Sequence, residues 1–205
     1  MIWEYTIPTL LFLLFCIAHS LMASVRFKKW LFDKAAWLKS FYRLIYNLLA
    51  LLLFGLWIVS LPADRILYRM DGILFWAMIA VQIFFFSLAL KALLSQNGLT
   101  FIGITQLIRK LRHNTEPGYL DEPERGRLVT SGIYGFVRHP MYTFIMLVMI
   151  CSPVMTANLL YAILLFALYF WIGTIFEEKN LVKRFGEDYK AYQKQTGRFL
   201  PKIFS

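Results

Sequence analysis

Long apolar runs constrain this chain more strongly than any other feature. Three of them, residues 5–24, 41–61 and 72–94, are each about as long as a helix that crosses a bilayer. Such a helix needs about 20 mostly apolar residues, because the hydrocarbon core offers the backbone no water to bond. The runs therefore predict membrane-spanning helices.

Two further apolar runs, 141–155 and 158–176, follow in the second half of the chain. Only a short polar break separates them, so they are expected to form a tight helical hairpin. The first of the two is short for a full crossing, and Pro153 is expected to kink or end it. The sequence thus predicts an all-α polytopic membrane protein with about five transmembrane helices in a single domain, 1–205.

The overall composition supports a membrane protein and excludes several other classes. Hydrophobic residues make up 59% of the 205 and charged residues 17%, against about 45–50% and 25% in soluble domains. These values exclude a disordered chain, a fibrous protein and a typical soluble enzyme. The net charge of +10 would also suit a nucleic-acid binder, but such a protein would not carry long apolar runs. Membrane lipids are the expected partners, and nucleic acid is not.

The basic residues are distributed unevenly along the chain. All of the 22 Lys and Arg except Arg65 and Arg69 lie in the segments between the first and second runs, between the third and fourth, and after the fifth, or at the run ends that adjoin these segments. Five crossings place these three segments on one side of the membrane. Because basic loops remain in the cytoplasm, we expect the N-terminus outside and the C-terminus in the cytoplasm.

The longest segment outside the apolar runs, residues 96–132, is expected to begin with an interfacial helix. Its apolar residues recur at roughly helical spacing among basic ones, as in helices that lie at the lipid headgroups. They are Phe101, Ile102, Ile104, Leu107, Ile108 and Leu111. Residues 113–127 are expected to form a polar loop, and nothing in the chain predicts a β-sheet.

Polar groups in or beside the apolar runs are candidate functional residues, because lipid makes them costly. They are His19, Ser20, Gln82, Lys91, Arg138, His139, Glu177 and Glu178. Because the hairpin is antiparallel, the Arg138–His139 pair is expected to lie at the same depth as the two glutamates. That would place two possible cations beside two carboxylates at the cytoplasmic face.

Each candidate also has a structural interpretation. Arg138 alone is typical of a membrane-surface anchor, and the glutamates alone are typical of solvated helix ends. His19 and Gln82 are expected in hydrogen bonds between helices. Tyr189 and Tyr192 in the polar tail are expected as interfacial aromatics rather than ligands.

The order of residues in the second half favours the functional interpretation. The run GIYGFVRHPMY from Gly132 to Tyr142 leads into the hairpin, then EEKNLVKRFG from Glu177 to Gly186, Tyr189, Tyr192, and RFLP from Arg198. This order, over residues 128–201, resembles the isoprenylcysteine carboxyl methyltransferase superfamily of integral-membrane methyltransferases. In the N-terminal half, AHSLMAS from Ala18 to Ser24 and YRLIY from Tyr42 to Tyr46 resemble its NnrU-like branch, which includes bacterial methanethiol S-methyltransferases.

The resemblance implies S-adenosylmethionine as the cofactor, and the residue chemistry agrees. Arg or His suits its carboxylate, Glu suits its ammonium or a ribose hydroxyl, and aromatic rings suit its adenine or sulfonium. The cofactor residues predicted in this way are Gly132, Tyr134, Val137, Arg138, His139, Pro140, Tyr142, Glu177 and Glu178.

The resemblance further implies methyl transfer to a small apolar acceptor, and a thiol such as methanethiol is the preferred candidate. It also implies a location in a bacterial inner membrane. A thiol reacts as its thiolate, so His19 or His139 is a candidate proton acceptor and Arg138 a candidate for stabilising the anion. On the substrate side the candidates are His19, Gln82 and Arg43.

Other functions stay open at this point. The acceptor is alternatively an isoprenylcysteine carboxylate, a lipid amine or an isoprenoid. A non-enzymatic NnrU-like membrane protein, such as a transporter subunit, would carry polar groups through the bilayer midplane, whereas these charges gather at one face. The spacing of His19, His113 and His139 fits no metal motif, so no metal is predicted.

Overall fold

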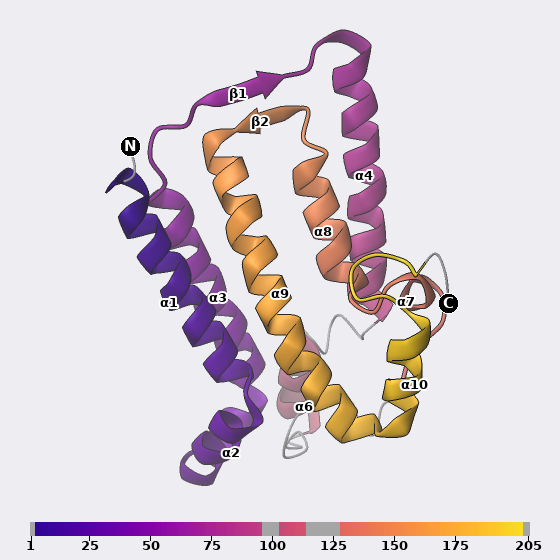
Figure 1. Cartoon of the computed structure of the whole chain (residues 1–205). Helices are drawn as coiled ribbons and strands as arrows, with labels where there is room; N and C mark the ends of the chain where they lie inside the picture. Colours follow the sequence, from indigo (N-terminus) through magenta and orange to yellow (C-terminus); the bar gives the residue numbers. More distant parts are fainter. Residues whose placement is uncertain (1–2, 96–102, 114–127, 203–205) are drawn as a thin grey trace. The chain divides into compact units, whose positions relative to one another are not determined.

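The computed structural model describes residues 3–95, 103–113 and 128–202 (Figure 1). Backbone contacts divide the chain into two compact units, Met1–Ala63 with Gln96–Gly126 and Asp64–Ser95 with Arg127–Ser205. Within the described residues, four helices are long and apolar enough to cross a membrane: Trp3–Ala23, Tyr42–Val59, Gly72–Ser95 and Ala157–Phe185. They confirm the all-α polytopic fold.

The first unit is built on two neighbouring helices. Its elements are η1 (Trp3–Tyr5), α1 (Thr6–Ala23), α2 (Val25–Lys34), η2 (Ala36–Ser40), α3 (Tyr42–Val59) and α6 (Ile104–His113). α1 packs along α3 (Figure 1), with the Phe12 ring 5.4 Å from that of Trp57. Ser24 separates α1 from α2 because its hydroxyl accepts a hydrogen bond from the Phe27 amide at 3.2 Å and caps α2.

A helix, α6, is present where the sequence predicted an interfacial helix, and its place at the lipid headgroups stays a prediction. It begins at Ile104 and ends at His113, so His113 closes a helix, whereas the sequence predicted a loop there. Ile104, Ile108 and Leu111 are exposed on it. The remainder of the predicted polar loop, residues 114–127, lies outside the described residues, as do Phe101 and Ile102.

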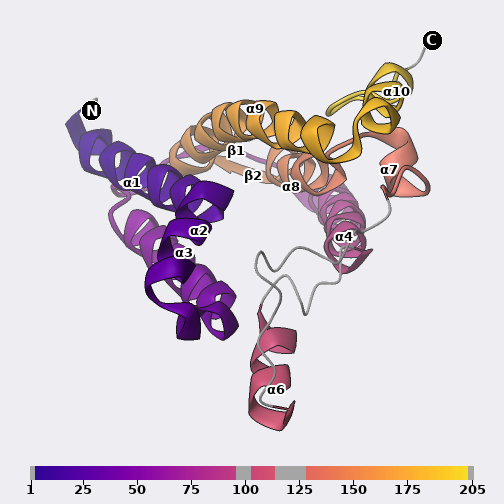
Figure 2. The same cartoon turned by 90° about the horizontal axis from the view of Figure 1, so that it is seen from below.

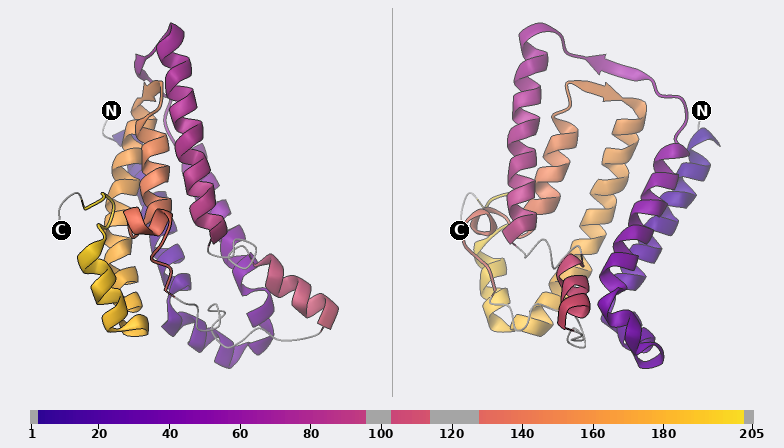
Figure 3. Two further views of the ribbon diagram at one scale, coloured as in Figure 1. Left: turned by 90° about the vertical axis from the view of Figure 1, so that its right-hand side faces the viewer. Right: turned by 180° about the vertical axis from the view of Figure 1, so that it is seen from behind.

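The second unit holds the predicted hairpin. Its elements are β1 (Ile66–Arg69), α4 (Gly72–Ser95), α7 (Ile133–Phe136), α8 (Pro140–Ile150), β2 (Val154–Thr156), α9 (Ala157–Phe185) and α10 (Glu187–Gln195). α8 lies between α4 and α9 and packs most extensively on α4 (Figures 1 and 3). The Gln82 amide donates to the Val148 carbonyl at 2.8 Å and ties α4 to α8.

The fourth apolar run is less helical than predicted. α8 ends at Ile150 after 11 residues, about 16 Å of helix, although the run was expected to continue to residue 155. Pro153 lacks an amide hydrogen and cannot continue the helix. The Ser152 hydroxyl instead donates to the Val154 carbonyl at 2.7 Å, and the chain becomes extended.

The extended segment forms a β-ladder, which corrects the expectation that the chain has none. β1 pairs with β2 in an antiparallel two-stranded sheet, with Ile66 opposite Thr156. The ladder lies at one end of α4, α8 and α9 (Figure 1). Beside it, the Asp64 carboxylate accepts a hydrogen bond from the Asn158 amide at 3.0 Å. Non-helical connections need such partners because unpaired backbone groups are costly near lipid.

The last helix of the hairpin is longer than its apolar run. α9 spans 29 residues and ends before Gly186, whose φ of 59° lies in the left-handed region that favours glycine. The final turns therefore carry Glu177 and Glu178 beyond the apolar part. After Gly186 the chain reverses into α10, which lies beside the end of α9, near α7 (Figure 2).

Candidate active site

The hairpin brings Arg138 and Glu178 together, as its antiparallel arrangement predicts. Arg138 lies two residues before the start of α8, and Glu178 lies in the last turns of α9. The Arg138 Nε donates to Glu178 Oε1 at 2.9 Å, and the Nη2 of the same guanidinium lies 2.8 Å from that oxygen. His139 Nε2 is 3.1 Å from the same Oε1. Only 5% of the Glu178 side chain is exposed, so this is a buried ion pair.

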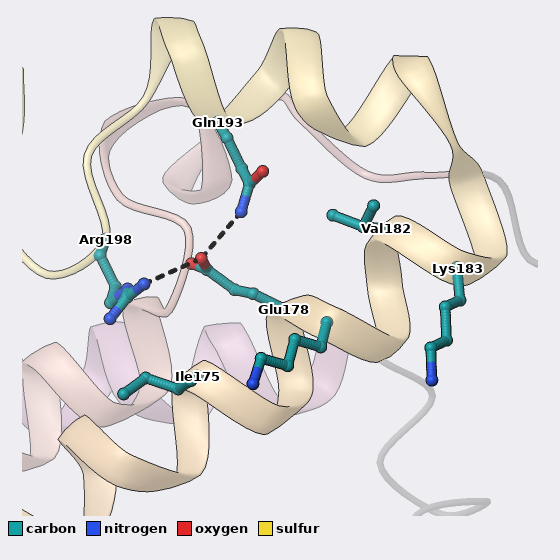
Figure 4. A pocket seen from close by; sticks show the side chains of 7 residues that line it. Ile175, Glu178, Val182, Lys183, Gln193 and Arg198 are labelled. Carbon is teal, nitrogen blue, oxygen red and sulfur yellow. Dashed lines mark hydrogen bonds and ion pairs between the residues drawn. The ribbon is translucent and has the colours of Figure 1, made fainter.

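The other oxygen of Glu178 binds the C-terminal segment. Gln193 Nε2 in α10 donates to Glu178 Oε2 at 2.9 Å, and Arg198 Nη2 donates to it at 3.2 Å (Figure 4). One carboxylate thus joins α9, the start of α8 and the tail. A buried carboxylate is tolerated when charges and hydrogen bonds compensate it in this way.

Backbone pairing fixes the same tail against the Arg138–His139 segment. The Arg138 amide donates to the Gly197 carbonyl at 2.8 Å, and the His139 amide donates to the Arg198 carbonyl at 3.2 Å. The Arg138 guanidinium also donates to the carbonyls of Gln193 and Thr196. A side chain at Gly197 would collide with the Leu200 carbonyl. This glycine therefore permits the tail to turn back on itself.

The two tail tyrosines are buried, which corrects their expected place at the membrane interface. Tyr189 is 2% exposed and Tyr192 is 5% exposed. The Tyr192 hydroxyl donates to the Tyr134 carbonyl at 2.5 Å and so ties α10 to α7. Burial raises the pKa of Tyr192 to about 12 and that of Tyr189 further. Both therefore remain neutral hydrogen-bonding groups.

Glu177 faces a different set of partners from its neighbour. The Tyr142 hydroxyl donates to Glu177 Oε2 at 3.2 Å, and His139 Nδ1 is 3.6 Å from the same oxygen. The Glu177 side chain is 45% exposed, whereas that of His139 is 4% exposed. Tyr142 stacks on Phe170 at 4.6 Å between ring centroids and on His139 at 5.8 Å. An accessible carboxylate thus borders an aromatic stack.

The remaining predicted cofactor residues surround this cluster. Pro140 is buried at the first position of α8, where proline suits a helix start. Val137 is buried and bridges Gly197 in parallel pairing. Gly132 precedes α7 with a φ of 64°. The Tyr134 hydroxyl donates to the Ala92 carbonyl at 3.5 Å and links α7 to α4.

The predicted substrate residues are divided between the two units. In the first unit, both ring nitrogens of His19 are within 3.0 Å of the Tyr46 hydroxyl of α3, and Arg43 lies in the first turn of α3. In the second unit, Gln82 makes the hydrogen bond between helices described above, the structural interpretation that the sequence also allowed. Their roles toward a substrate stay predictions.

Sequence reasoning missed Gln193 and Thr196 and gave Arg198 no role. Arg198 stands in the quoted RFLP motif, so its position was a signal. Gln193 directly follows Tyr192 in α10, but nothing in its spacing from Glu178 indicates a contact across the turn at Gly186. Arg138 and Glu178 therefore make more contacts with the C-terminal tail than the sequence indicated.

An apolar helical hairpin with buried charges at one end, in a chain of membrane-spanning helices, is typical of an integral-membrane enzyme. The chain belongs to the phospholipid methyltransferase family, which matches residues 76–188. The match runs from α4 into α10 and includes Arg138, His139, Glu177 and Glu178. The protein is therefore an integral-membrane methyltransferase, as the sequence predicted.

Individual relatives agree with that family. Methanethiol S-methyltransferase from Pseudomonas deceptionensis is 32% identical over 200 residues, which cover 96% of this chain and 72% of the relative. Methanethiol S-methyltransferase 2 from Bradyrhizobium diazoefficiens is 29% identical over 96% of this chain and 73% of its own length. The protein-S-isoprenylcysteine O-methyltransferase of Schizosaccharomyces pombe is 37% identical, but over only 37% of this chain and 34% of its own length. No solved structure matches.

Proposed function

We propose that the protein transfers a methyl group from S-adenosylmethionine to a small apolar thiol, with methanethiol as the first candidate and a thioether as the product. The similarity to methanethiol S-methyltransferases over nearly the whole chain supports the acceptor. The observation that carries the proposal is the accessible Glu177 carboxylate beside the stack of His139, Tyr142 and Phe170.

The described residues fit the cofactor's chemical groups. Glu177 offers a carboxylate for the ammonium, and the rings of Tyr142 and Phe170 offer a face for the sulfonium or adenine. The N-terminus of α8 favours a carboxylate. When bound, S-adenosylmethionine supplies an electrophilic methyl group, which a thiolate sulfur takes by in-line displacement.

The geometry favours a positioning role for Arg138. Its guanidinium donates to Glu178 and to the carbonyls of Gln193 and Thr196, and only 8% of the side chain is exposed. In this proposal Arg138 and Glu178 hold His139 and the tail in place. Glu177 and Tyr142 are the groups that contact the cofactor.

The chain's own chemical task is to receive the thiol proton and exclude water. The sulfur forms its bond to the methyl carbon while the donor's carbon–sulfur bond breaks, and the thiol proton must leave. His139, whose side chain is 4% exposed and whose Nε2 lies against Glu178, is the proposed acceptor of that proton. His19 remains the alternative acceptor on the substrate side.

We also propose that the site faces the cytoplasm of a bacterial inner membrane, with the N-terminus outside. Within the second unit, the β-ladder that carries Arg69 lies at the opposite end of the hairpin from α10, whose segment is rich in lysine (Figure 1). This supports the positive-inside assignment. A reporter fusion showing a cytoplasmic N-terminus would contradict it.

Binding and turnover test the proposed function separately. S-adenosylmethionine and S-adenosylhomocysteine should raise the unfolding temperature of the purified protein, and labelled methyl should appear in dimethyl sulfide when methanethiol is added. N-acetyl-S-farnesylcysteine belongs in the same screen because of the partial similarity to isoprenylcysteine enzymes. Turnover with that compound alone would replace the thiol acceptor, and a lack of binding of both cofactor forms would contradict S-adenosylmethionine as the methyl donor.

A further inference from the structure

A cleft lies on another side of Glu178, between the end of α9 and α10. Its volume is about 430 Å³, and its lining residues come from α9, α10 and the tail (Figure 4). They are Ile175, Glu178, Lys179, Val182, Lys183, Gln193 and Arg198. Glu177, Tyr142 and His139, which carry the proposed methyl transfer, are not among these lining residues.

The charge of the cleft is positive. Three of its lining side chains are cationic, Lys179, Lys183 and Arg198, and among these described lining residues Glu178 alone is acidic. The negative charge of Glu178 is already balanced by Arg138, whose Nη2 lies 2.8 Å from Glu178 Oε1. Lys183 lies in the last turn of α9 and so suits the helix dipole, but Lys179 lies a turn earlier. An anion is therefore the complementary occupant.

An exposed apolar stripe on α9 leads into this cleft. Leu164, Leu168 and Trp171 are 63%, 59% and 56% exposed, and Ile175 and Lys179 continue the same helix face at spacings of three and four residues. Arg198 lies over the Trp171 ring, with its guanidinium carbon 5.5 Å from the centroid. The stripe belongs to a helix that is long and apolar enough to span a membrane, and lipid acyl chains are the solvent that such exposed apolar side chains require.

We propose that this cleft binds the phosphate of an anionic phospholipid, with the lipid's acyl chain along the Leu164–Leu168–Trp171 stripe. Lysines and an arginine at the end of an apolar helix face match a negative headgroup attached to a hydrocarbon tail. Arg198 also holds Glu178 at 3.2 Å. A bound headgroup would therefore contact the tail that is paired with the Arg138–His139 segment. This lipid is a bound partner and not the methyl acceptor.

Native mass spectrometry of the detergent-purified full chain tests the proposal by titration with phosphatidylglycerol and with phosphatidylcholine. Phosphatidylglycerol should bind more tightly. The Lys179→Gln/Lys183→Gln variant should bind it roughly 25-fold more weakly, since each lysine at a membrane surface contributes about fivefold. The matched control Lys190→Gln/Lys194→Gln, which removes two lysines from α10, should stay within about twofold of the unaltered protein.

Further measurements keep the test decisive. Inorganic phosphate should not displace the lipid, because it lacks the acyl chain, and Leu168→Gln should weaken lipid binding while both lysines remain. Equal binding of the two lipids, or equal losses in the two double variants, would overturn the proposal. A loss of S-adenosylmethionine binding in Lys179→Gln/Lys183→Gln would assign the cleft to the cofactor instead. If that variant does not fold, Lys183→Gln alone should still lose roughly fivefold.

Discussion

Replacing Glu178 by Gln should destabilise the protein more than any other single change at the site. The substitution keeps the shape of the side chain but removes the negative charge that faces Arg138 and Arg198. Removing one partner of a buried ion pair costs about 3–5 kcal/mol. Because the Gln oxygen can still accept one hydrogen bond, we expect the lower end, about 3 kcal/mol. That corresponds to roughly a hundredfold change in the folding equilibrium constant.

The free energy of unfolding can be measured by titration with sodium dodecyl sulfate in mixed micelles, followed by circular dichroism. The neighbouring Glu177→Gln is the matched control, because it makes the same chemical change in a side chain that is 45% exposed. It should cost less than about 1 kcal/mol of stability while weakening binding of S-adenosylmethionine. If Glu178→Gln were as stable as the unaltered protein, or if Glu177→Gln were the less stable variant, the assignment of the buried anchor to Glu178 would be refuted.

Three other substitutions test the contacts around this anchor. Gly197→Ala should lower stability by about 1–3 kcal/mol, because the added Cβ would collide with the Leu200 carbonyl. The control Gly173→Ala, whose Cβ would meet nothing within 4 Å, should leave stability unchanged in the same titration. Tyr192→Phe should cost about 1 kcal/mol of stability through the lost hydrogen bond to the Tyr134 carbonyl. Hydrogen exchange of the α7 amides should increase, and unchanged exchange would argue that this hydrogen bond does not hold α10 against α7. Gln82→Leu should cost about 0.6 kcal/mol through its bond to Val148 and leave the KM for the acceptor unchanged, whereas a raised KM at constant stability would indicate substrate binding.

The hairpin and its charges were predictable because membrane-spanning helices obey strong local rules. The apolar runs predicted both ends of α1, α3 and α4, and the start of α9, to within a few residues. The antiparallel turn predicted Arg138 beside Glu178. Pro153 was a visible signal that α8 would be interrupted. The sequence did not reveal where the interruption starts, because most residues that follow Ile150 are still apolar and the extended conformation of Val154–Thr156 comes with pairing to the distant β1.

The tail was less predictable because its structure depends on partners distant in sequence. Residues 193–198 are mostly polar and contain Gly197, which is typical of an irregular chain end. Their order comes from pairing with the backbone of Arg138 and His139 and from Glu178. β-Like pairing of one residue with another about 60 positions away leaves no periodic signal in a segment this short. Burial of Tyr189 and Tyr192 follows from the same docking.

The adjacent pair Glu177–Glu178 shows how one helix can assign two identical side chains to different tasks. Successive residues on a helix point about 100° apart, so Glu178 is directed at Gln193 and Arg198 while Glu177 is directed at Tyr142. The buried carboxylate is surrounded by donors from the protein and can anchor Arg138 only while it remains charged. The exposed carboxylate retains access for a ligand. Glu178 therefore holds the site together, while Glu177 is placed to bind a ligand within it. Exchanging the surroundings of the two carboxylates would abolish both roles.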